Sequence, residues 1–344
     1  LKRIKKFDDA AYEASEKKWL TLVKPLFSLG RLEKAVSQMA GIKGKRDFDL
    51  EKKILVIMCA DNGVVKEGIS QCGSEVTATA ARSFAFGESA ACIMAKRAGV
   101  DVLPIDAGMV TDVSEIRSIK QSYGTENMAE GPAMARENCI KIIEKAIDIV
   151  GELAENNYDI ILTGEMGIGN TTTASAVTFV LLDKDPSEVT GRGAGLTSEM
   201  LKHKIEVIKK AIDINKPDKN DPLDVLSKVG GYDIAGMAGL FIGGAVYGIP
   251  VVIDGFISSV SALLACRIDS RVKDYILPSH LSEEAAAKYI LKELGLEPFI
   301  SCGMFLGEGS GAVSLMPLLD MALDVYNKLN TFDKWEHEAY KVLR

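Results

Sequence analysis

Short apolar runs alternate with longer helical stretches through the middle of this 344-residue chain. The runs lie at 54–59, 100–105, 159–162, 251–253 and 299–302, and several are apolar throughout and rich in β-branched residues. Such runs are typical of strands that are buried on both faces of a parallel sheet. Helical periodicity occurs between them, at 138–149, 171–182, 201–214 and 283–294. The alternation predicts an α/β fold with a doubly wound, mostly parallel sheet.

The two ends of the chain differ from this middle region. Residues 10–38 have the apolar spacing of an amphipathic helix, interrupted near Pro25 and Gly30, and residues 315–343 show the same spacing. We therefore expect a small helical domain formed from both chain ends, 1–39 and 315–344. The large α/β domain would comprise residues 40–314.

The composition excludes several classes of protein. Hydrophobic residues make up 47% of the chain and charged residues 26%, which excludes a disordered chain. The net charge of −7 argues against a general nucleic-acid binder, which normally carries a basic surface. No apolar stretch is long and uninterrupted enough for a membrane span, and no apolar region of a signal peptide follows the basic N-terminal residues. We expect a cytoplasmic protein that binds neither nucleic acid nor membrane.

Metal and disulfide chemistry is also disfavoured. The six cysteines lie far apart without a CxxC pair, and the chain has only three histidines. Cysteines in this pattern are typical of small buried side chains in a reducing compartment. We expect no metal site and no other cofactor.

Acidic residues and glycines follow the predicted strands. They are Asp61-Asn62-Gly63, Asp106-Ala107-Gly108, Gly164-Glu165, Asp254-Gly255 and Gly303. Ligands of parallel α/β sheets bind beyond the carboxyl ends of the strands, where these residues would lie. Aspartate and glycine also make good turns and helix caps, so each aspartate alone has a structural explanation.

The glycine-rich segment 162–174 combines a strand, a turn and a helix start with three threonines. Glycines let backbone N–H groups approach a ligand, and a helix N-terminus attracts anions, so the segment predicts a phosphate site. Asn170 stands where a P-loop requires lysine, and the third glycine of a dinucleotide fingerprint is missing. A mononucleotide or a sugar phosphate is the ligand class that remains.

Two further loops carry charged residues beside glycines. The segment 191–195 contains Arg192 and precedes a helix with Lys202 and Lys204, which suits either an anion site or a solvated helix face. In 306–312, Glu308 is flanked by glycines, whereas structural turns more often use Asp, Asn or Ser. No GxSxG motif is present there, and a Ser-His-Asp enzyme is disfavoured by the scarcity of histidine.

Glu165 and Glu308 would thus lie in separate glycine loops at one edge of the sheet. A pair of carboxylates beside a phosphate site suggests glycosyl chemistry at a ribose phosphate. The adjacent acids of pyrophosphate-dependent phosphoribosyltransferases are absent after Asp106 and Asp254. The donor expected from these residues is a nucleotide with its own good leaving group, used without metal. A nucleotide N-glycosidase that uses water is an alternative.

Along nearly its whole length the chain resembles the nicotinate-nucleotide:dimethylbenzimidazole phosphoribosyltransferase family, which assembles the lower ligand of cobamides. The segments that carry the resemblance are 28–33, 60–64, 67–70, 163–173, 236–254, 279–283 and 306–312. It implies a doubly wound sheet, a small helical domain from both chain ends and a homodimer. It also implies a reaction in which the base attacks C1′ of nicotinate mononucleotide, nicotinate leaves, and an α-riboside 5′-phosphate forms.

The resemblance also implies roles for individual residues. Glu308 matches the catalytic base of the family and Glu165 a second carboxylate in the base site. The positions that match the nucleotide and phosphate site are Met166, Gly167, Gly169, Asn170, Thr171, Gly193, Lys204 and Ser282. Those that match the pocket for the base are Gly73, Ser74, Arg82, Phe305 and Leu306. A free glutamate, with a pKa of about 4.3, would be ionised at neutral pH unless burial raises its pKa.

The chain departs from the family pattern near the expected base pocket. Cys72-Gly73 stands where Tyr-Pro is common, Arg82 where a neutral polar residue is common, and Phe305 where arginine is usual. Leu26-Phe27 replaces a common Pro-Gly nearer the N-terminus. A changed pocket leaves open whether the acceptor is a substituted benzimidazole, adenine or a phenol. It also leaves open a weakly active or non-catalytic paralogue that supports a partner subunit.

Overall fold

The computed structural model describes residues 3–193, 195–336 and 338–342. Its centre is a six-stranded sheet in the order β3-β2-β1-β4-β5-β6, in which all the pairs are parallel. The strands are β1 (Lys53–Ala60), β2 (Val100–Gly108), β3 (Arg117–Ser118), β4 (Ile160–Met166), β5 (Val251–Val252) and β6 (Ile276–Leu277). The strand order reverses between β1 and β4, which confirms the doubly wound α/β prediction.

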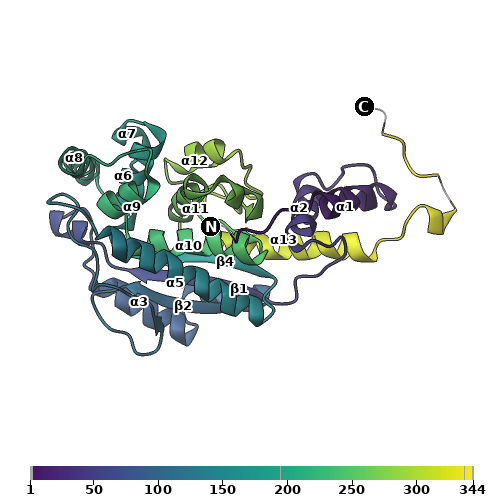
Figure 1. Cartoon of the computed structure of the whole chain (residues 1–344), viewed down its shortest axis with the longest axis horizontal. Helices are drawn as coiled ribbons and strands as arrows, with labels where there is room; N and C mark the ends of the chain where they lie inside the picture. The colour runs from purple at the N-terminus through teal and green to yellow at the C-terminus, as the bar shows by residue number, and fades with distance from the viewer. Residues whose placement is uncertain (1–2, 194, 337, 343–344) are drawn as a thin grey trace.

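Helices cover the sheet and form an end of the molecule (Figure 1). The α-helices are α1 (Asp9–Thr21), α2 (Arg31–Lys43), α3 (Glu75–Phe86), α4 (Ala90–Ala98), α5 (Arg136–Glu155), α6 (Asn170–Leu182), α7 (Pro186–Val189), α8 (Ser198–Asn215), α9 (Pro222–Val229), α10 (Tyr232–Tyr247), α11 (Phe256–Ile268), α12 (Ala287–Leu294) and α13 (Ser310–Lys328). Short 3₁₀ helices are η1 (Gly63–Glu67), η2 (Ser270–Tyr275) and η3 (Asp333–Trp335).

The side chains of β1 divide between two hydrophobic cores. Ile54, Val56 and Met58 join the core beneath α5 and α10, whereas Leu55 and Ile57 join the core beneath α4 and α13. All eight residues of the strand are buried, because successive side chains point to opposite faces and both faces are covered by helices. The continuous apolar runs of the sequence are explained by this arrangement.

Helix α10 packs unusually close to α5. A Cβ atom at Gly239 would lie only 2.5 Å from the carbonyl oxygen of Ile143, so a side chain at this position would force the helices apart. The first turn of α10, which carries an aspartate discussed below, is also buried.

Both chain ends pack together beside the sheet. Trp19 of α1 lies against Tyr326 of α13, with 4.8 Å between ring centroids, and Leu22 pairs with Thr331 in an antiparallel bridge. The division into 1–39 with 315–344 and 40–314 stays a prediction. Both of its boundaries fall inside helices, α2 and α13.

Three predicted elements differ from the structure. Residues 299–302 form no strand, because the N–H groups of Phe299 and Ile300 both turn to the Ser279 carbonyl and only one isolated bridge results. The helix predicted at 283–294 begins at Ala287, since the Ser282 hydroxyl accepts the Glu284 N–H in a turn. The helix predicted at 315–343 ends at Lys328, and residues 337 and 343 lie outside the described residues.

Asp254 joins the end of the sheet to α13. The carboxylate is buried and accepts backbone N–H groups from Gly309 at 3.1 Å, Gly311 at 2.7 Å and Ala312 at 3.1 Å. It therefore satisfies three donors at the start of α13 that the helix itself cannot satisfy. Asp254 thereby holds the loop that contains Glu308.

Replacement of this buried cap will destabilise the fold. We expect Asp254→Ala to lower the free energy of unfolding by about 3 kcal/mol, because three buried N–H groups lose a charged acceptor. Urea unfolding followed by circular dichroism measures the change. The exposed Asp213→Ala on α8 is the control and should change stability by less than about 0.5 kcal/mol. A loss below about 1 kcal/mol in Asp254→Ala would contradict this account of the cap.

Candidate active site

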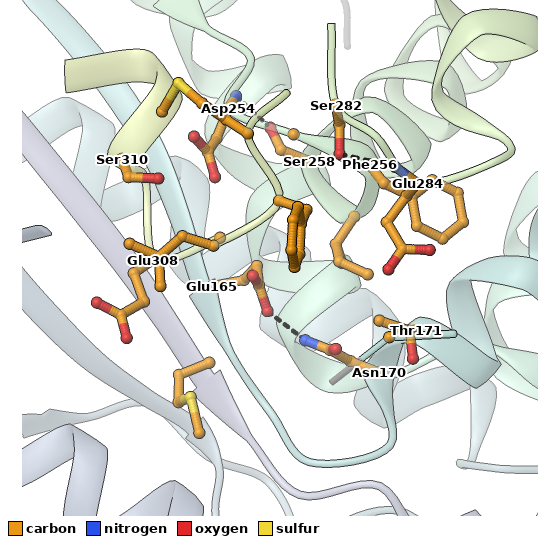
Figure 2. A pocket seen from close by; sticks show the side chains of 18 of the residues that line it. Glu165, Asn170, Thr171, Asp254, Phe256, Ser258, Ser282, Glu284, Glu308 and Ser310 are labelled. Atoms are coloured by element: carbon orange, nitrogen blue, oxygen red, sulfur yellow. Dashed lines mark hydrogen bonds between the residues drawn. The ribbon is translucent and has the colours of Figure 1, made fainter. Parts of the chain in front are cut away.

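A cavity of about 610 Å³ opens at the carboxyl edge of the sheet, next to the reversal between β1 and β4. Figure 2 shows the side chains that line it, with Glu165, Asn170 and Glu308 among them. They come from β4, the start of α6, the loops after β5 and β6, and the loop before α13. Ligands of doubly wound sheets bind at such a position, so the cavity is the candidate active site.

Glu165 lies at the end of β4, in contact with the loop before α13. The Asn170 side-chain amide donates a hydrogen bond to its carboxyl, drawn as a dashed line in Figure 2. Burial and, to a smaller extent, the negative charge of Asp233 raise the pKa of Glu165 to about 8, although the hydrogen bond from Asn170 opposes the shift. At neutral pH this carboxyl is therefore mainly protonated.

Glu308 has a left-handed backbone with φ of 60° between two glycines, Gly307 at 81° and Gly309 at 90°. A side chain in this region costs about 1 kcal/mol, so the surrounding contacts must impose it. One of these contacts is with Gly164, where a Cβ atom would lie 2.7 Å from the Glu308 carbonyl oxygen. The segment of β4 that carries Glu165 and the loop that carries Glu308 are thus in direct backbone contact.

The Glu308 carboxylate points away from Glu165 in Figure 2. Burial raises its pKa, while the backbone of Ala91 and the side chain of Ser89, at the start of α4, oppose the shift. One of its carboxylate oxygens is buried without a hydrogen-bond partner. Such an oxygen is free to accept a proton or a hydrogen bond from a ligand.

A second, smaller cavity of about 100 Å³ adjoins the first. The two share Gly167, Ile168, Asn170, Thr171 and Gly193 in their walls, so they are direct neighbours. The small cavity lies at the N-terminus of α6, where the positive end of the helix dipole favours an anion.

Lys204 supplies a positive charge at this end. It is 1% exposed, and its ammonium group donates to the Thr171 hydroxyl at 2.8 Å and to the Gly191 carbonyl at 3.3 Å. Burial lowers its pKa to about 8, and the charge of Glu284 opposes that shift. An anion bound here would stabilise the charged form of the lysine.

The structure brings most of the predicted site residues together. The larger cavity is lined by Glu308, Glu165, Met166, Gly167, Asn170, Thr171, Gly193, Ser282, Phe305 and Leu306. Two further predicted residues, Gly169 and Lys204, line the smaller cavity. Gly73, Ser74 and Arg82 line neither of these two cavities. Ser74 precedes α3 and Arg82 is exposed on that helix, so their placement in the base pocket stays a prediction.

Two aspartates at strand ends serve the structure of the loops. Asp61 accepts the Val110 N–H at 2.8 Å, and Asp106 accepts the Met109 N–H at 2.8 Å and pairs with Lys120 at 2.9 Å. Neither residue lines the two cavities. The interpretation of these residues as turn formers therefore fits the structure better than a role in a ligand site.

Sequence reasoning missed three acidic or polar neighbours of the site. Asp233, in the first turn of α10, accepts a hydrogen bond from Asn170, and Glu284 lines the larger cavity. The Thr77 hydroxyl of α3 accepts the Ile168 N–H at 3.3 Å. The only signal for Asp233 in the sequence is the Gly-Gly pair before α10. The other signals are missing because the residues that meet here are far apart in the chain.

Within the described residues, no group of three or more His, Cys, Asp or Glu side chains is arranged to hold a metal ion. In the same part of the chain, no helix combines the length and the apolarity that are needed to cross a bilayer.

Comparisons with known proteins agree with this geometry. A family model described as phosphoribosyltransferase matches residues 4–336. The nicotinate-nucleotide–dimethylbenzimidazole phosphoribosyltransferase of Clostridium acetobutylicum is 46% identical, covering 100% of this chain and 98% of its own. That of Acetivibrio thermocellus is 48% identical, covering 93% and 92%. A crystal structure of the enzyme of the same name from Thermus thermophilus is 32% identical, with a TM-score of 0.90 and coverage of 96% and 99%. The chain belongs to the nicotinate-nucleotide–dimethylbenzimidazole phosphoribosyltransferase family.

Proposed function

We propose that this chain transfers ribose 5-phosphate from nicotinate mononucleotide to a benzimidazole-type base, giving the α-riboside 5′-phosphate and nicotinate. The observation that carries the proposal is a pair of adjoining cavities, the larger lined by two carboxyls, Glu165 and Glu308, and the smaller by a buried lysine beside a helix N-terminus. A nucleoside monophosphate matches this arrangement, because it has the reactive C1′ at one end and a dianionic phosphate at the other. The names of the relatives support this substrate pair.

The phosphate would bind in the smaller cavity. The N–H groups at the start of α6 and the Lys204 ammonium would hold its oxygens, and Thr171 and Ser282 would add hydroxyl donors between phosphate and ribose. Gly169 and Gly193 have left-handed backbones, with φ of 92° and 50°, which glycine adopts without strain. The ribose would then place C1′ in the larger cavity.

Glu308 would act as the general base. An imidazole nitrogen of the acceptor attacks C1′ while its other nitrogen loses a proton to the Glu308 carboxylate. The bond from C1′ to the pyridinium nitrogen breaks, and its electron pair neutralises the positive ring of the departing nicotinate. Because that ring is already cationic, its departure requires no general acid.

Glu165 would have a different role in the same pocket. Its raised pKa, about 8, keeps it mainly protonated at neutral pH, so it serves as a hydrogen-bonding group that orients the acceptor. This revises the expectation of a glutamate that is ionised at neutral pH.

Phe305 and Leu306 would form the wall of the acceptor pocket. Both residues are exposed in this structure and line the larger cavity, and Phe305 is 66% exposed. A flat aromatic acceptor can stack on such a ring. Gly73, Ser74 and Arg82 are further candidates for this wall.

We also propose a cytoplasmic homodimer. The six cysteines are all free of disulfides, and Cys72 and Cys302 are exposed, which suits a reducing compartment. The neighbouring helices α3 and α4 expose Phe86 and Ile93, large apolar side chains that a second copy would cover.

Glu308→Gln tests the assignment of the base. We expect the rate of riboside phosphate formation to fall by about 10²- to 10⁴-fold, because the amide cannot accept the proton, while nicotinate mononucleotide binds nearly as before. Product formation followed by mass spectrometry and calorimetric binding of the nucleotide give the two values. The exposed Glu297→Gln is the control and should keep the native rate. Near-normal turnover of Glu308→Gln would show that another group removes the proton.

Phe305→Arg tests the acceptor wall. Loss of the ring should change the ratio of kcat/KM between dimethylbenzimidazole, adenine and phenols by about tenfold, a change in relative stacking energy of roughly 1 kcal/mol. The KM for nicotinate mononucleotide should stay within about twofold of the native value, since Phe305 does not line the phosphate cavity. A competition assay with an equimolar mixture of acceptors measures the ranking. Phe27→Arg, another exposed phenylalanine, is the control, and an unchanged ranking in Phe305→Arg would place this ring outside the pocket.

Sedimentation velocity tests the homodimer. We expect a particle of twice 37.1 kDa in the native chain and a shift toward the monomer in Ile93→Glu, because a charge on the covered face opposes association. A native chain that sediments as a monomer at micromolar concentration would refute the dimer.

A further inference from the structure

Asp233 is a buried acid that the proposed reaction does not use. It lies in the first turn of α10, directly after Gly230 and Gly231, and its side chain is completely buried. It lines neither of the two cavities. A carboxyl without access to solvent is costly unless its oxygens are satisfied, so its presence requires an explanation.

One amide links Asp233 to the active site. The side-chain nitrogen of Asn170 donates to Asp233 Oδ2 at 3.0 Å and also to Glu165 Oε2. An amide nitrogen carries two hydrogens, so each carboxyl receives one. Asp233 and Glu165 thereby fix the orientation of Asn170 between them, and Asn170 in turn holds one oxygen of Glu165.

The backbone leaves no spare room around this chain of contacts. A Cβ atom at Gly167 would lie 3.0 Å from Asp233 Oδ2, and one at Gly231 would lie 2.6 Å from Asn62 Oδ1. Asp233 Oδ1 and Asn62 Oδ1 are both buried without hydrogen-bond partners. The position of Asp233 is therefore set by glycines and by close packing rather than by an ion pair.

The groups around the two carboxyls are largely acidic. The titratable or charged neighbours of Glu165 and Asp233 are Cys59 of β1, Asp61 after β1, Asp254 after β5, Glu308 before α13 and, through Asp254, His280 after β6. Lys204 and Glu284 lie at the phosphate end of the site. Burial raises the pKa of Asp233 only to about 6, against about 8 for Glu165. At neutral pH the proton therefore resides mainly on Glu165 and the negative charge on Asp233.

We propose that Asp233 is a positioning residue for Glu165, which it orients through Asn170 and keeps protonated by its own buried negative charge. The inference rests on the proposed function, because it assigns the protonation states of that site. Glu165 then presents a neutral carboxyl to the acceptor, and Glu308 is left as the carboxylate that takes the proton. Two glutamates in one pocket acquire different roles because Asn170 links only Glu165 to Asp233.

The test is the titration of Glu165 in the full-length chain. The infrared band of its carboxyl, isolated as the difference between the native protein and Glu165→Gln, reports protonation without turnover. Since a nearby negative charge raises the pKa of an acid, Asp233→Asn should lower the pKa of Glu165 by about one unit. The pH dependence of kcat is measured at saturating nicotinate mononucleotide, because the bound phosphate keeps Lys204 charged. As the pH rises through the pKa of Glu165, kcat should decline. That decline should move to lower pH in Asp233→Asn, giving a kcat that is about tenfold lower at pH values above both midpoints.

Two controls separate this effect from general damage. Asp106→Asn removes another buried aspartate at the same edge of the sheet, one that pairs with Lys120 and does not touch Asn170. It should reduce stability without moving the titration of Glu165. In the background of Glu165→Gln, Asp233→Asn should leave the pH profile of kcat unchanged, because the residue that titrates is absent.

Three outcomes would overturn the inference. One is a titration of Glu165 that is the same in Asp233→Asn and the native chain. Another is a shift of the kcat profile that persists in the Glu165→Gln background. The third outcome can be measured in the native chain alone, so it applies even if Asp233→Asn fails to fold. If Glu165 of the native chain titrates with a pKa of about 4.3, the residue is not held protonated. A native chain that forms no riboside phosphate would refute the proposed function, whereas the infrared titration would still decide the role of Asp233.

Discussion

The buried carboxylate of Asp254 is the contact on which the active-site architecture depends. It follows β5 and accepts three backbone N–H groups at the start of α13, so it fastens a loop from the far end of the chain to the carboxyl end of β5. Removal of a carboxylate from water costs several kcal/mol, and each charge-assisted hydrogen bond returns about 1.5–3 kcal/mol. Three such bonds can therefore offset the cost. The left-handed backbone of Glu308 is tolerated because this contact fixes the residues that follow it.

The electrostatics of the site follow from its burial at the carboxyl edge of a sheet that helices cover on both faces. Several acids converge at the carboxyl edge, where burial raises the pKa of Glu165, Asp233 and Asp254. The one buried lysine of the site lies at the other end, beside the N-terminus of α6. A substrate with a dianionic phosphate and a cationic leaving group matches this separation of charge. The positive pyridinium ring would lie near the acids and the phosphate near the lysine.

Much of the fold and of the site could be predicted from local sequence patterns. The apolar runs at 54–59, 100–105, 159–162 and 251–253 correspond to strands, because strands covered on both faces require apolar residues at every position. The glycine-rich segment 162–174 marked the turn and the start of α6, and the glycines around Glu308 marked the second loop. The run at 299–302 was misleading, since apolar β-branched composition cannot report whether a neighbouring strand is available to pair with it.

The sequence by itself determined the class of fold, the glycine loops and the two glutamates that they present, because each is encoded within about a dozen consecutive residues. Only the tertiary structure decided which of the acids serve the loops and which face the cavity. It placed Asp61 and Asp106 in turns, Asp254 both under α13 and in the wall of the larger cavity, and Asp233 behind Asn170. It also decided the raised pKa of Glu165, since a pKa depends on burial and on charges that are distant in sequence but adjacent in space.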